Sequence, residues 1–121
     1  MKVICEKIID PDSGETKQND SWLTVGKTYH VLSVFMNEGG NTEYRIIADD
    51  GTTPAIFNAN QFKVASPDLP KSWIANCEPG SYFELAPAAW TEPGFWENYF
   101  DGEMEAVSCF DLEVKKIVNQ E

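Results

Sequence analysis

The sequence predicts an α+β fold, in which a small β-barrel or strongly bent antiparallel sheet is followed by C-terminal helices. Before residue 87, short runs rich in β-branched and aromatic residues alternate with turn signals such as Asp-Gly and Pro-Gly. After residue 90, apolar residues recur at helical spacing. A chain of 121 residues can bury an independent core, so we expect one domain over 1–121, β-rich over 1–86 and helical over 91–120.

Each predicted strand is a short apolar run bounded by polar residues or turns. The segment "DPDSGETKQNDS" (10–21) contains no apolar residue and is expected to be an exposed loop. In "TEYRIIA" the alternation places Tyr44, Ile46 and Ala48 on one face, and the "DDG" that follows predicts a tight turn. The predicted strands occupy 2–9, 23–36, 42–48, 53–59, 60–66, 72–78 and 81–86.

A first helix is predicted within "WTEPGFWENYFDG" (90–102). Thr91 or Glu92 can cap its start, Pro93 suits its first turn, and Gly102 ends it. At about 100° per residue, the four aromatic residues of this segment share one face and the polar residues share the other. We therefore expect all four aromatic residues to be core: Phe95, Trp96, Tyr99 and Phe100.

A second helix is predicted over 103–120. Acidic Glu103 and Glu105 stand at its start and basic Lys115 and Lys116 near its end, and both placements suit the helix dipole. Its apolar residues recur at three- and four-residue steps, as in one buried helix face: Val107, Phe110, Val114 and Ile117.

The chain carries a net charge of −11, from 20 acidic and nine basic residues. Such a field repels nucleic acids and anionic membranes and attracts basic surfaces, so we expect neither nucleic acid nor membrane as a partner.

The N-terminal segment lacks a long apolar run, which disfavours a signal peptide or anchor. Three cysteines without CxxC spacing are typical of reduced thiols, and we expect a cytoplasmic protein.

No catalytic constellation is recognisable, and we expect no enzyme activity, no cofactor and no metal. His30 is the only histidine, and a packed strand residue explains it. Asp10, Asp12 and Glu15 resemble the start of a calcium loop, but the glycine and glutamate that such a loop requires are absent. Acid–base chemistry by carboxylates in a cleft, for example by Glu84 and Glu92, stays open as a further interpretation.

Acidic residues are concentrated between Lys71 and Lys115, where nine acids and no base occur. Each acidic residue, taken alone, is explained by a solvent-exposed helix face. The nine acids taken together predict a binding surface for a basic protein partner. Tryptophan is frequent among binding hot spots, so the predicted binding surface includes one of the four tryptophans. Exposed aromatic residues could also pair two copies of the chain, so a homodimer stays open as an alternative. The predicted partner-binding residues are Glu92, Trp96, Glu97, Asp101, Glu103 and Glu105, with Asp49 and Asp50 on a hairpin tip.

Residues 22–66 resemble an SH3-like barrel. The resemblance is carried by "VGKTYHV", the Asp-Gly hairpin and the short turn before "FKVA". No acidic-aromatic "ALYDY" segment is present near the start, so the proline-peptide groove of SH3 domains is not carried over.

The whole chain is similar to small acidic bacterial immunity proteins of polymorphic toxin systems, including contact-dependent growth inhibition. The segment with "PGFWENYFDG" and the C-terminal helix carry this resemblance. It implies a stoichiometric inhibitor that binds the C-terminal toxic domain of a cognate effector, in many cases a nuclease with a basic active site, and it implies no catalytic residue. The alternative is an SH3-like interaction or regulatory module with a non-toxin partner.

Overall fold

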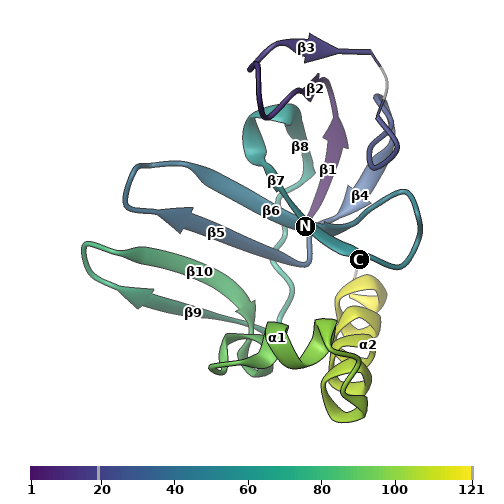
Figure 1. The fold of residues 1–121 in the computed structure, drawn as a ribbon. Coiled ribbons are helices and arrows are strands. Elements are labelled where there is room, and N and C mark those ends of the chain that lie inside the picture. The colour runs from purple at the N-terminus through teal and green to yellow at the C-terminus, as the bar shows by residue number, and fades with distance from the viewer. Residues whose placement is uncertain (19, 121) are drawn as a thin grey trace.

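The computed structural model describes residues 1–18 and 20–120 and has an α+β fold, with strands first and helices last (Figure 1). Asn19, in the predicted loop, and Glu121, at the end of the predicted domain, lie outside the described residues. The strands are β1 (Lys2–Cys5), β2 (Ile8–Ile9), β3 (Thr16–Lys17), β4 (Thr28–His30), β5 (Ser33–Asn37), β6 (Thr42–Ile47), β7 (Pro54–Asn58), β8 (Phe62–Ser66), β9 (Trp73–Glu78) and β10 (Tyr82–Pro87).

The described strands form three antiparallel sheets and no closed barrel. The largest sheet has the order β7-β6-β5-β10-β9, the second has the order β4-β1-β8, and β2 pairs with β3. The chain leaves β7 through a 3-10 turn, η1 (Ala59–Gln61), and β8 then pairs with β1 instead of extending the large sheet. The predicted antiparallel sheet is therefore confirmed, whereas the SH3-like barrel is not confirmed, because strand pairing divides between two sheets at this turn.

Most predicted strands are confirmed, and two are interrupted. Tyr44, Ile46 and Ala48 are all buried, as the alternation predicts. The predicted strand 2–9 stops after Cys5, whose backbone N–H and C=O bond Lys27 and Gly26 across a turn. The predicted strand 23–36 begins only after that turn and is divided at residues 31–32 into β4 and β5. The predicted loop 10–21 carries the two-residue strand β3.

The helical part is η2 (Ala88–Thr91, a 3-10 helix), α1 (Phe95–Phe100) and α2 (Met104–Asn119). Both α-helices lie together at one end of the large sheet, beside the ends of β9 and β10 (Figure 1). The predicted second helix is confirmed, and Phe110 and Ile117 are buried on it. The predicted cap of the first helix is wrong: Gly94, in the left-handed region with φ 81°, precedes α1, and the Thr91 hydroxyl donates to the Ala88 carbonyl.

An aromatic cluster fixes the helices to the sheet. Trp90 is 2% exposed and stacks on Phe110 at 5.1 Å between ring centroids, while the Trp96 ring meets it edge-on at 5.5 Å. The prediction that all four aromatic residues of α1 are core is wrong for Phe100, which is 61% exposed. As the last residue of a six-residue helix, Phe100 contacts the rings of Trp96 and Tyr99 only from the outside.

Candidate functional site

One face of the large sheet is open over part of its surface. Alternation along β6 buries Tyr44 and Ile46 on one face and turns Glu43 and Arg45 to the other. The strand registers then align one row of side chains across all five strands on that second face. From β7 to β9 the row reads Asn58, Glu43, Phe35, Glu84 and Asn76.

A cavity of about 370 Å³ lies over this row. Its floor includes Phe35, Glu43 and Glu84, and Trp90 and Trp96 close one end. The aromatic wall is a stacked pair, in which the ring of Phe35 lies 5.9 Å from the ring of Tyr82 across β5 and β10. A neighbouring hollow of about 680 Å³ is also lined by Glu43 and Ile56, so the two are adjacent at β6 and β7.

Arg45, the only arginine of the sequence, is the central cation of this cavity. Its guanidinium carbon lies 3.7 Å from the centroid of the Trp96 ring, a cation–π contact. Burial lowers the pKa of Arg45 to about 10 against the opposing effect of Glu84 and Glu43, so it stays charged at neutral pH. Burial raises the pKa of the Glu84 carboxyl, and Arg45 counteracts that rise. Arg45 was not among the predicted site residues, and its being the sole arginine was the only signal.

Three of the predicted acids come together at the start of α2. Glu92, Glu103 and Glu105 line a shallow groove of about 240 Å³, beside Asn98 and Cys109, and none of the described residues that line it is basic. All three glutamates are exposed. The groove can therefore hold a cationic group from a partner.

The other predicted residues of the helical region lie outside this groove. Glu97 and Asp101 are exposed on α1 and directly after it, and neither lines the groove. Trp96 is half-buried, and Arg45 already covers its ring. A partner would therefore contact the Trp96 ring only together with Arg45. The Trp96 ring is not uncovered, as a tryptophan anchor for a partner would need to be.

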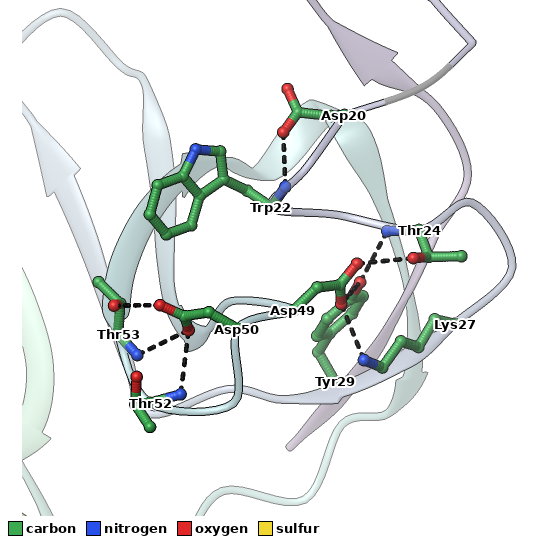
Figure 2. A network of polar contacts seen from close by, with 9 residues as sticks. All are labelled: Asp20, Trp22, Thr24, Lys27, Tyr29, Asp49, Asp50, Thr52 and Thr53. Atoms are coloured by element: carbon green, nitrogen blue, oxygen red, sulfur yellow. Dashed lines mark hydrogen bonds and ion pairs between the residues drawn. The ribbon is translucent and has the colours of Figure 1, made fainter.

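Asp49 sits at the start of the predicted hairpin turn and is engaged within the protein (Figure 2). One carboxylate oxygen accepts bonds from Lys27 Nζ and Tyr29 Oη, both at 2.8 Å, and the other accepts from Thr24 Oγ1 at 2.6 Å. Burial pushes the pKa of Asp49 upward, but these three donors outweigh it and hold the pKa below its ordinary value. Asp49 thus joins the segment before β4 to the end of β6.

Asp50 holds the turn itself. Its carboxylate accepts the backbone N–H of Thr52 and of Thr53 at 3.0 and 2.9 Å, and the Thr53 hydroxyl also donates to it, which lowers its pKa (Figure 2). Asp50 is exposed. Burial raises the pKa of the Tyr99 hydroxyl most, and the negative charges of Asp111 and then Asp50 raise it further.

The remaining candidates for chemistry are accounted for locally. The Asp10 carboxylate accepts the backbone N–H of Asp12 and of Ser13, which makes it a turn residue. His30 is half-buried in β4, and burial, with Lys2, lowers its pKa. Cys5, Cys77 and Cys109 are free thiols. Within residues 1–18 and 20–120, no helix has the length and apolar character needed to cross a membrane.

Alkaline pH is expected to weaken the fold through Tyr29. Burial, together with the hydrogen bond and charge of Asp49, raises the pKa of Tyr29 to about 12 against the opposing Thr24 amide. An acid with a raised folded-state pKa stabilises the fold below its unfolded pKa of about 10 and loses that contribution as pH rises towards 12. Urea unfolding at pH 8 and pH 11 should show a larger loss of stability for the natural chain than for Tyr29→Phe. Parallel losses in the two chains would contradict this assignment.

Comparison with protein-family models, with curated proteins and with solved structures found no match to this chain.

Proposed function

We propose that this protein binds and neutralises a basic toxin domain as a stoichiometric inhibitor in the bacterial cytoplasm. The observation that carries the proposal is the groove beside α2, where Glu92, Glu103 and Glu105 gather without a basic side chain. Glu97 and Asp101, which are exposed on α1 and directly after it, add charge of the same sign to the helical region. A net charge of −11 also steers a cationic domain towards the protein.

In this proposal the protein inhibits the toxin by covering its active site. Many nucleolytic sites are basic because they bind phosphate, and an acidic protein surface complements such a site. The resemblance to immunity proteins of polymorphic toxin systems supports the same partner class. Inhibition of this kind needs affinity of about nanomolar, or about −12 kcal/mol, which a few desolvated contacts and complementary charge can supply.

An SH3-like interaction module with a non-toxin partner is the second candidate. It is supported by the 3-10 turn η1 directly before β8, at the place where the resemblance expects a short turn. The two candidates differ in the partner, since the module would bind a signalling or regulatory protein and would inhibit no toxin.

Affinity capture separates the two candidates. The tagged chain is purified from its native host in moderate salt, and co-purifying proteins are identified and quantified by mass spectrometry. A basic domain at equal stoichiometry, whose toxic activity the chain abolishes, supports the inhibitor. Recovery of the chain alone, or of non-toxin proteins only, contradicts it.

Neutralising the groove is expected to slow association with the captured basic domain. In the triple variant Glu92→Gln, Glu103→Gln and Glu105→Gln, the association rate at low salt should fall by about tenfold because electrostatic steering weakens. Stopped-flow or surface-based kinetics at two salt concentrations measure it. The matched control changes three exposed acids elsewhere: Glu15→Gln, Glu38→Gln and Glu78→Gln.

The position of the charge change decides the outcome. Equal slowing by the groove variant and by the control variant would mean that only net charge matters and that the groove is not the contact. A further double variant, Glu97→Lys with Asp101→Lys, tests the outer surface of α1. An unchanged rate and affinity in this variant would remove both residues from the binding surface.

A further inference from the structure

The open face of the large sheet has the features of a docking surface that the acidic groove does not supply. The cavity over Phe35 and the hollow beside it meet at Glu43 and Ile56, so together they cross the outer face of β6 and β7. Two large apolar side chains are exposed along the route, Ile56 at 49% and Trp22 at 42%. An exposed apolar path of this kind is typical of a surface that a partner covers.

The charges along this groove select the occupant. Around the cavity, Glu43, Glu84 and Glu92 oppose one cation, Arg45. In the adjoining hollow, Asp10 and Asp20 oppose Lys17, which already pairs with Asp20 at 3.2 Å. Negative charge therefore exceeds positive charge in both halves, and an occupant that carries positive charge is favoured.

The row of side chains across the sheet defines where that positive charge would lie. Phe35 has Glu43 opposite it on one neighbouring strand and Glu84 opposite it on the other. Side chains directly opposite one another have Cβ atoms about 5 Å apart, so the Glu43 and Glu84 side chains leave the sheet on either side of Phe35, and all three line the cavity. The stacked rings of Phe35 and Tyr82 add a flat apolar wall.

We propose that this groove takes an extended basic segment of the protein partner, and that one arginine of the segment inserts between the Phe35–Tyr82 wall and the carboxylates of Glu43 and Glu84. Arginine fits better than lysine because its planar guanidinium both stacks on aromatic rings and pairs with carboxylates. The lining of the cavity already contains one stacked guanidinium, since Arg45 lies on the Trp96 ring. This inference rests on the proposed binding of a basic partner and names the anchor of that partner.

The test begins without any partner. The ¹⁵N-labelled full chain is titrated with N-acetyl-arginine amide and, as an isosteric neutral probe, with N-acetyl-citrulline amide. Arginine should produce saturable shifts in the Trp96 indole N–H and in the backbone amides of Phe35 and Glu84, and citrulline should not. Equal shifts with both probes, or arginine shifts that never saturate, would overturn the proposal.

Variants locate the site. Glu84→Gln should weaken arginine binding by about fivefold, and Glu78→Gln, at the exposed end of the neighbouring strand β9, should leave it unchanged. If Glu84→Gln disturbs folding, Glu43→Gln is the second variant, with the same expected weakening. Undiminished arginine binding in a folded variant of either residue overturns the proposal.

The partner experiment keeps the two proposals separate. If a captured basic domain binds Glu84→Gln and Glu43→Gln as tightly as the natural chain, the groove proposal fails while the inhibitor function stands. If arginine binds in the cavity as expected but capture yields no toxic domain, the inhibitor function fails while the arginine site stands. A basic domain whose affinity falls in both variants supports the two together.

Discussion

Trp90→Ala is expected to lower the free energy of unfolding by about 3–5 kcal/mol, the range for removing a large aromatic side chain from a packed core. Trp90 stands between the sheet and both α-helices, and its ring contacts those of Phe95, Trp96 and Phe110. Its removal would leave a cavity that these rings cannot fill, because α1 holds Phe95 and Trp96 in place and α2 holds Phe110. The helical part should therefore detach first.

Chemical denaturation followed by circular dichroism measures this effect, and Trp22→Ala is the matched control. Trp22 is the same residue type but is 42% exposed, so its truncation should cost far less. Comparable losses for the two variants would show that the aromatic cluster is not what joins helices and sheet.

Asp49→Ala is expected to lower the free energy of unfolding by about 2 kcal/mol, the second large effect. The substitution leaves the buried Tyr29 hydroxyl without its acceptor and releases Thr24 and Lys27. A buried donor that has lost its acceptor costs more stability than the loss of an exposed hydrogen bond. Most of the expected loss in free energy of unfolding therefore comes from the Tyr29 hydroxyl.

Asp50→Ala provides the comparison for that effect. The two aspartates are adjacent, but the bonds of Asp50 reach only two or three residues along the same turn. We expect a smaller loss for Asp50→Ala, measured in the same denaturation experiment. A loss as large as that of Asp49→Ala would mean that the turn, and not the link to β4, carries the stability.

The pattern of acids and aromatic residues between 92 and 106 illustrates how far sequence reasoning reaches. Periodicity correctly places Phe95 in the core, since helical spacing is a local property. The exposure of Phe100 could not be predicted, because it depends on where a six-residue helix ends relative to its neighbours. The gathering of Glu92 with Glu103 and Glu105 likewise depends on how the segment between η2 and α1 packs beside the start of α2.

The sequence by itself determined the elements of this protein: its α+β composition, the order of strands and helices, the Asp-Gly turn and the buried face of β6. These follow from propensity, alternation and turn chemistry, which act over a few residues. Only the tertiary structure decided the division into separate sheets and the arrangement of the candidate sites. Arg45 meets Trp96, and Phe35 lies between Glu43 and Glu84, because strand register and helix packing join segments that are distant along the chain. Such contacts have no period in the sequence, so pattern reasoning could not have found them.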